Sequence, residues 1–67
     1  MEITKIKYFN QTSDIIITVR IEELHNKTWI ESPHKLTIFI DTLTINYKDT
    51  THKFNSMAQL MQFAFNI

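Results

Sequence analysis

Cysteine and glycine are both absent from this chain of 67 residues, and proline occurs once. A chain without cysteine forms no disulfides and has no thiolate to bind a metal, which favours a reducing compartment. A chain without glycine lacks the loops whose backbone amides can approach a phosphate closely. P-loop and dinucleotide-binding fingerprints are therefore excluded.

An excess of charge of either sign is also missing, because seven Lys and Arg side chains balance seven Asp and Glu side chains. No long-range field then steers the chain toward nucleic acid or an anionic membrane. The first ten residues lack the basic start and apolar run of a signal peptide, and no apolar stretch is long enough to span a bilayer. We expect a cytoplasmic protein without a membrane partner.

The length predicts a single small domain over residues 1–67. A domain of this size buries only about 60% of the surface that its unfolded chain exposes. Its core is therefore marginal, and disulfides, a metal or a partner subunit often support such domains. With cysteine absent, association with another protein or with a second copy is the support that remains.

Residue usage is biased, with eleven Ile and six Lys against one Arg and two Ala. A β-rich fold favours Ile, but it does not explain why Arg and Gly are scarce. AT-rich codons explain both the surplus of Ile and Lys and the scarcity of Arg and Gly. The composition indicates a low-GC bacterium, or a phage or mobile element carried by one.

Alternation with a period of two predicts the strands. The clearest case is residues 15–21, where Ile15, Ile17, Val19 and Ile21 share one face. Residues 2–9 form an earlier strand whose inward face stays open, because both faces carry apolar side chains. The polar residues 10–14 suit a hairpin connection between these two strands.

The middle of the chain predicts a loop over residues 25–34, closed by Pro33, and then a long β-rich run. One apolar parity is shared by Leu36, Ile38 and Ile40, and the other by Leu43, Ile45 and Tyr47. The parity therefore slips at Asp41 and Thr42, which marks either a bulge or a turn between strands. We favour a bulge or bend, since a two-residue hairpin turn requires positive φ and no glycine is present. Residues 48–51 predict a type I turn, and residues 52–54 a short returning strand.

Residues 55–67 contain no charged side chain and predict a helix that starts at Ser56 or Asn55, with Phe54 as a hydrophobic staple. Its polar side chains fall in one narrow wedge, so its apolar surface is wider than packing on one sheet requires. The predicted fold is α+β: an antiparallel sheet of three to four strands with one C-terminal α-helix packed on one face.

No catalytic, cofactor-binding or metal-binding residues are predicted. The acidic residues show no spacing that converges on a reacting bond, and the three histidines match no compact metal-ligand motif. Basic and aromatic side chains do alternate weakly, with Lys5, Lys7 and Phe9 on one strand face and Lys35 and Phe39 on another. A single-stranded nucleic acid binder therefore remains an alternative.

Exposed apolar side chains point instead to contact with another protein. The candidates are the side chains of the loop, of the β-rich run and of the helix flanks, namely Trp29, Phe39, Phe63, Phe65 and Ile67. We expect a small, non-enzymatic, intracellular protein-binding protein, accessory or inhibitory, that acts without cofactors. The first alternative is a homo-oligomer that uses the apolar helix as its assembly interface.

Overall fold

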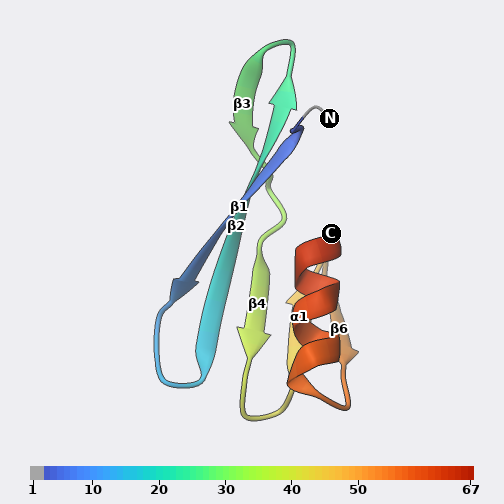
Figure 1. The fold of residues 1–67 in the computed structure, drawn as a ribbon. Coiled ribbons are helices and arrows are strands. Elements are labelled where there is room, and N and C mark those ends of the chain that lie inside the picture. The colour runs from blue at the N-terminus through green and yellow to red at the C-terminus, as the bar shows by residue number, and fades with distance from the viewer. Residues whose placement is uncertain (1–2) are drawn as a thin grey trace.

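Within residues 3–67, six antiparallel strands form one sheet and a single helix packs on it (Figure 1). Along the chain the strands β1 to β6 come first and the helix α1 follows. The computed structural model describes residues 3–67. The predicted first strand began at Glu2, which lies outside the described residues. The elements are β1 Lys5–Gln11, β2 Ile16–His25, β3 Thr28–Glu31, β4 Leu36–Phe39, β5 Thr44–Tyr47, β6 Thr50–Lys53 and α1 Met57–Asn66.

The predicted α+β class, with an antiparallel sheet and a C-terminal helix, is confirmed, but the number of strands was underestimated. The long strand β2 pairs with β1 along one edge and with both β3 and β4 along the other. The remaining strands follow outward as a meander, which gives the order β1-β2-β4-β5-β6 with β3 paired to β2.

The predicted loop over residues 25–34 is wrong, because most of it is a hairpin. The turn residues Asn26 and Lys27 have φ of 50° and 65°, and β3 then runs back along β2. The Ser32 amide still donates to the Ile21 carbonyl of β2 at 2.8 Å. The chain then bulges away from β2 at residues 33–35, where Pro33 has no N–H to donate. Strands β3 and β4 are thus two parts of one interrupted path beside β2.

The parity slip at Asp41 and Thr42 is a turn between separate strands, so the favoured bulge is wrong. Residues 40–43 connect β4 to β5, and Leu43 has a φ of 53°. The turn between β5 and β6 also differs from the type I turn that we expected. Lys48 and Asp49 both have positive φ, at 50° and 60°, which is the primed geometry that suits the twist of a two-residue hairpin.

The core lies between α1 and the face of the sheet that it covers. Leu60 and Ala64 of the helix are fully buried against inward-facing strand residues, which are Val19, Ile21, Leu36, Ile38 and Ile45. These strand residues come from three neighbouring strands and meet by register, as in the pair Ile38 and Ile45. The predicted parities of β2, β4 and β5 are therefore confirmed.

The helix begins at the predicted cap. The Ser56 hydroxyl accepts a hydrogen bond from the Gln59 amide at 3.2 Å, and the Gln59 side chain accepts one from the Asn55 amide at 3.2 Å. Both contacts satisfy backbone donors near the first turn. Phe54 packs against the core beside this start.

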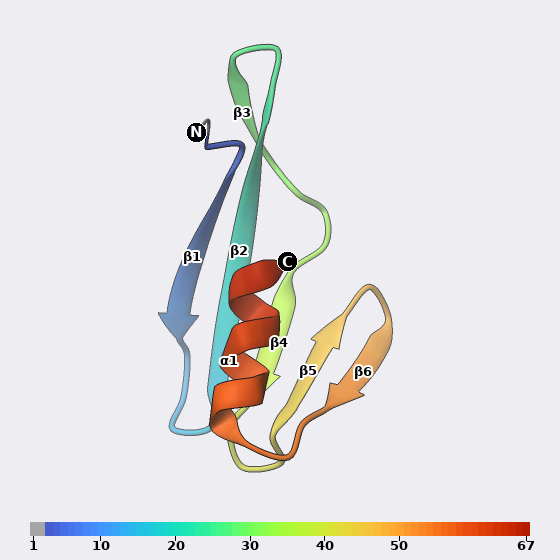
Figure 2. The ribbon, with the colours of Figure 1, turned by 45° about the vertical axis from the view of Figure 1, so that its right-hand side comes forward.

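The helix covers only part of the sheet, and the turn end of the β2–β3 hairpin extends well beyond it (Figure 2). The radius of gyration is 12.6 Å and the longest dimension is 38 Å, whereas a compact chain of this length has a radius of gyration of about 11 Å. We call residues 22–31 the arm. It carries no buried core residue.

The β2–β3 turn generates a first prediction. Lys27 has a φ of 65°, which costs a residue with a Cβ more than it costs glycine. We expect Lys27→Gly to raise the free energy of unfolding by about 0.5–1 kcal/mol, measured by urea denaturation. The control is Thr28→Gly, which places glycine inside β3 and should lower stability by a similar amount. Equal effects of the two variants would contradict the turn geometry.

The core generates a second prediction. Leu60 is fully buried, whereas Phe65 is 58% exposed. Leu60→Ala should cost about 2–5 kcal/mol, which is enough to unfold much of a domain this small. Phe65→Ala should cost about 1 kcal/mol, because it removes one aromatic contact. Far-UV circular dichroism during thermal unfolding distinguishes the two variants. A larger loss of stability for Phe65→Ala would mean that α1 is rotated about its axis, with Phe65 rather than Leu60 in the core.

Candidate interaction surface

The five predicted partner-binding residues lie in separate parts of the molecule. Trp29 is on β3, and Phe39 is on β4. Trp29 pairs with Leu24 of β2, whereas Phe39 pairs with Ile16 at the other end of that strand. The two aromatic residues share the face that the helix leaves uncovered, but they stand about 26 Å apart along β2, at about 3.3 Å per residue.

The three candidates on the helix have different surroundings. Phe63 is half-buried, and its ring lies 4.7 Å from the ring of His52 and 5.3 Å from that of Phe54, so it packs α1 onto β6. Ile67 is half-buried against the core. Phe65 is the exposed one, and its ring meets Phe9 of β1 at 5.3 Å.

The arm holds two exposed apolar side chains, and no second layer within residues 3–67 covers it. Trp29 is 39% exposed and Ile30 is 50% exposed. They point to opposite faces of β3, since they are neighbours in one strand. The arm therefore presents apolar surface on both of its sides. Its base is three-stranded, because Glu22 and Glu23 pair with β1 as well as with β3. Only its turn end is a two-stranded ribbon, a structure that is marginally stable in water on its own.

The base of the arm is held by a polar network that sequence patterns alone did not reveal. The Arg20 guanidinium contacts Glu22 at 2.5 Å and Glu31 at 3.5 Å, and it lies 4.2 Å from the centre of the Tyr8 ring. These residues come from β1, β2 and β3. Arg20 and Glu22 share a face at a spacing of two, but only the register shows that Tyr8 and Glu31 join them.

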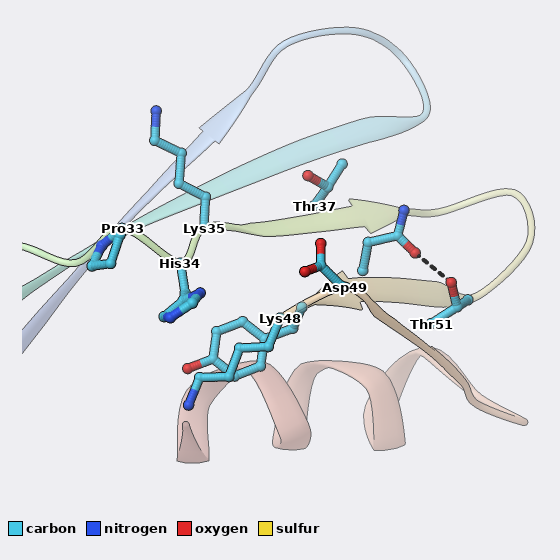
Figure 3. Close-up of a pocket in the computed structure, with 9 residues that line it drawn as sticks. Pro33, His34, Lys35, Thr37, Lys48, Asp49 and Thr51 are labelled. Atoms are coloured by element: carbon cyan, nitrogen blue, oxygen red, sulfur yellow. Dashed lines mark hydrogen bonds between the residues drawn. The ribbon is translucent and has the colours of Figure 1, made fainter.

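A hollow of about 400 Å³ opens between the start of β4 and the β5–β6 turn (Figure 3). His34 meets the Tyr47 ring with centroids 6.4 Å apart, and the Lys48 ammonium lies 5.3 Å from the centre of the same ring. Thr51 and Asn46 share a hydrogen bond of 2.8 Å. Most of the lining side chains are exposed, so the hollow lacks the supporting shell that holds catalytic groups in place.

The weak basic and aromatic pattern does not form one platform. Lys7 and Phe9 face the helix, as their contacts with Phe65 show. Phe39 lies on the opposite face of the sheet, because its neighbour Ile38 is in the core. A single-stranded nucleic acid would have to contact both faces at once. The structure therefore does not bring these side chains together.

Among residues 3–67, no three His, Asp or Glu side chains lie close enough together to hold a metal ion. In the same part of the chain, no helix is long and apolar enough to cross a membrane. Comparisons with known protein families, with curated proteins and with solved structures find no match to this chain.

Lys7 makes a contact that the sequence did not predict. Its ammonium donates a hydrogen bond to the Phe65 carbonyl, one of the last carbonyls of α1. That end of a helix attracts positive charge, and the last turn of α1 has no basic residue of its own. Partial burial, together with the charge of nearby Lys5, lowers the pKa of Lys7 below its usual value. Lys7 thus ties the end of the helix to β1.

This contact generates a third prediction. Lys7→Met keeps the aliphatic stem and removes the hydrogen-bond donor to the Phe65 carbonyl, so it should lower stability by about 0.5–1 kcal/mol at neutral pH. Because the folded state lowers the pKa of Lys7, the wild type gains stability relative to this variant as pH rises toward the unfolded value of Lys. Urea denaturation at neutral and alkaline pH measures the difference.

The control for Lys7 is Lys5→Met. Lys5 is exposed and makes no hydrogen bond with the helix, so its loss should change stability by less than about 0.5 kcal/mol. A stability difference between wild type and Lys7→Met that narrows with rising pH would contradict the assigned surroundings of Lys7.

Proposed function

We propose that this chain is a small, non-enzymatic, cytoplasmic protein-binding protein, accessory or inhibitory to its partner, and that the arm makes the contact. The observation that carries the proposal is the exposure of Trp29 and Ile30 on a hairpin that no other part of the described chain covers. Trp is enriched among the residues that contribute most to protein–protein affinity. A partner that covers the arm would supply the layer that residues 3–67 do not provide.

The charges on the arm suit this role. Glu23 and Glu31 lie beside the apolar side chains and are partly exposed. Glu31 is also near Arg20, so part of its charge is already balanced. An apolar centre with a polar rim is the usual anatomy of a protein–protein interface. The proposed mechanism is occlusion of a site on the partner, with no chemical step.

The amino-acid composition indicates which organisms to search for the partner. The bias toward Ile and Lys supports a phage or mobile element of a low-GC bacterium as the origin of the chain. We therefore propose that the partner is a bacterial protein, and lysates of low-GC bacteria are the first material to search.

Affinity capture with matched variants tests the arm, which is the fourth prediction. Trp29→Ser and Ile30→Ser should each weaken capture of a specific partner by about tenfold or more, because each removes exposed apolar contact area. Ile15→Ser is the control, since Ile15 is 43% exposed in the β1–β2 connection, outside the arm. Circular dichroism of all three variants establishes that they are folded.

Trp29 also provides a direct signal, because it is the only tryptophan in the chain. Binding through the arm should shift its fluorescence emission to shorter wavelength as the ring leaves water. Capture that survives both arm substitutions, or that Ile15→Ser weakens equally, would exclude the arm as the contact surface.

A further inference from the structure

A second surface, separate from the arm, surrounds the outer edge of β1. This strand ends the sheet, and in the described part of the chain only β2 pairs with it. It is seven residues long, whereas the strand at the opposite end, β6, has four. An unpaired edge of this length is a template for another strand.

The backbone register shows which residues of β1 direct their N–H and C=O groups away from β2. The Leu24 amide donates to the Thr4 carbonyl at 2.9 Å, in line with the β1–β2 pairing. Because antiparallel strands alternate between hydrogen-bonded and non-hydrogen-bonded pairs, the next residues directed at β2 are Ile6, Tyr8 and Asn10. The backbone groups of the intervening residues point away from the sheet, and these residues are Lys5, Lys7, Phe9 and Gln11.

The side chains of the outward-directed residues lie on the same side of the sheet as α1. Phe9 is 39% exposed, and its ring contacts the exposed ring of Phe65. Lys7 reaches the Phe65 carbonyl. The free edge therefore has an exposed aromatic pair directly beside it, contributed by β1 and the end of α1.

We propose that two copies of this chain associate through the outer edges of β1, antiparallel and with the two-fold axis at Tyr8, so that their sheets become continuous. The axis is perpendicular to the sheet, and both helices then lie on one side of it. The Phe9 and Phe65 rings of each copy fill the space between the two helices. This surface is distinct from the arm, and the inference does not rest on the proposed function.

The position of the lysines favours a second copy in this register. With the axis at Tyr8, Lys7 of one copy faces Phe9 of the other, and Lys5 faces Gln11, so no two lysines stand directly opposite each other. Every outward-directed residue then exchanges backbone hydrogen bonds. An axis at Lys7 would place two lysines directly opposite each other, which is destabilising. An axis at Phe9 would leave Lys5 without a backbone partner.

The face away from the helices is also self-complementary at this axis. Tyr8 of one copy meets Tyr8 of the other at a non-hydrogen-bonded position, where side chains approach most closely. Tyr8 is 40% exposed, and cross-strand aromatic pairs are favourable. The zero net charge of the chain adds no overall repulsion between the copies.

Amide hydrogen exchange on the unmodified chain tests the proposal. The amides of Lys7 and Phe9 should exchange rapidly at micromolar concentration and slow by about tenfold or more near millimolar concentration, because dimerisation protects them. The Tyr8 amide, which bonds to β2, is the internal control and should be protected at both concentrations. Sedimentation equilibrium must show a dimer over the same range, and a monomer throughout would overturn the proposal.

Two substitutions at one position test the register and provide the fifth prediction. Phe9→Lys places a lysine opposite Lys7 of the other copy, whereas Phe9→Glu places a carboxylate there. We expect Phe9→Lys to weaken dimerisation about tenfold more than Phe9→Glu at low salt, with the difference shrinking as salt is added. Thr50→Lys on β6 is the control for added charge and should leave the dimer unchanged.

The outcomes separate this proposal from the function of the arm. Equal weakening by Phe9→Lys and Phe9→Glu would overturn the Tyr8-centred pairing. A dimer that survives Phe9→Lys but is lost in Trp29→Ser would place the contact on the arm and overturn the edge. Concentration-dependent protection of Lys7 and Phe9 together with the predicted order of the two variants supports the edge pairing.

Discussion

One helix of ten residues packs on a sheet of six strands, and that mismatch in size governs the rest of the structure. The helix buries Leu60 and Ala64 over the middle of one face. The opposite face of the sheet and the arm lie beyond its reach. The helix does contact β1 through Phe65, but in residues 3–67 the outer backbone edge of β1 has no partner strand. Each of these uncovered regions carries aromatic or aliphatic side chains, so the surfaces available for binding follow from what one short helix cannot cover.

The two candidate surfaces differ in what they offer a partner. The arm presents side chains, with Trp29 and Ile30 on opposite sides of β3, and it demands no particular backbone geometry. The β1 edge presents backbone donors and acceptors in a fixed order, with Lys7 and Phe9 beside them. Side-chain surfaces accept partners of many shapes, whereas a strand edge requires another strand. The proposed pairing of two copies along β1 therefore leaves the arm free for the proposed partner.

The sequence was sufficient for the class of fold and for most of the core, because periodicity reports which side chains are buried. Val19, Ile38 and Ile45 were on the expected faces, and Ser56 capped the helix as expected. The turns were predicted poorly for a specific reason. The absence of glycine argued against positive φ, yet Asn26, Lys27, Lys48 and Asp49 all adopt it, since the twist of a two-residue hairpin outweighs the local cost.

The candidate surfaces were harder to predict, because they depend on register. Phe65 was singled out as exposed, but nothing in the sequence pairs it with Phe9 and Lys7, which lie more than fifty residues earlier. Phe63 has the same residue type and lies two positions away, yet it packs on His52 and Phe54. A helical wheel separates the two flanks of α1, but only the sheet order shows that one flank meets β6 and the other β1.

The position of α1 after all six strands has a consequence for synthesis. The strands leave the ribosome first, and the apolar face formed by Val19, Ile38 and Ile45 has no cover until residues 60–64 follow. During that interval the nascent chain exposes both its core face and its strand edges, the condition in which growing chains aggregate most readily. Packing of the charge-free helix thus ends the vulnerable period, and slow translation of the codons for α1 would prolong it.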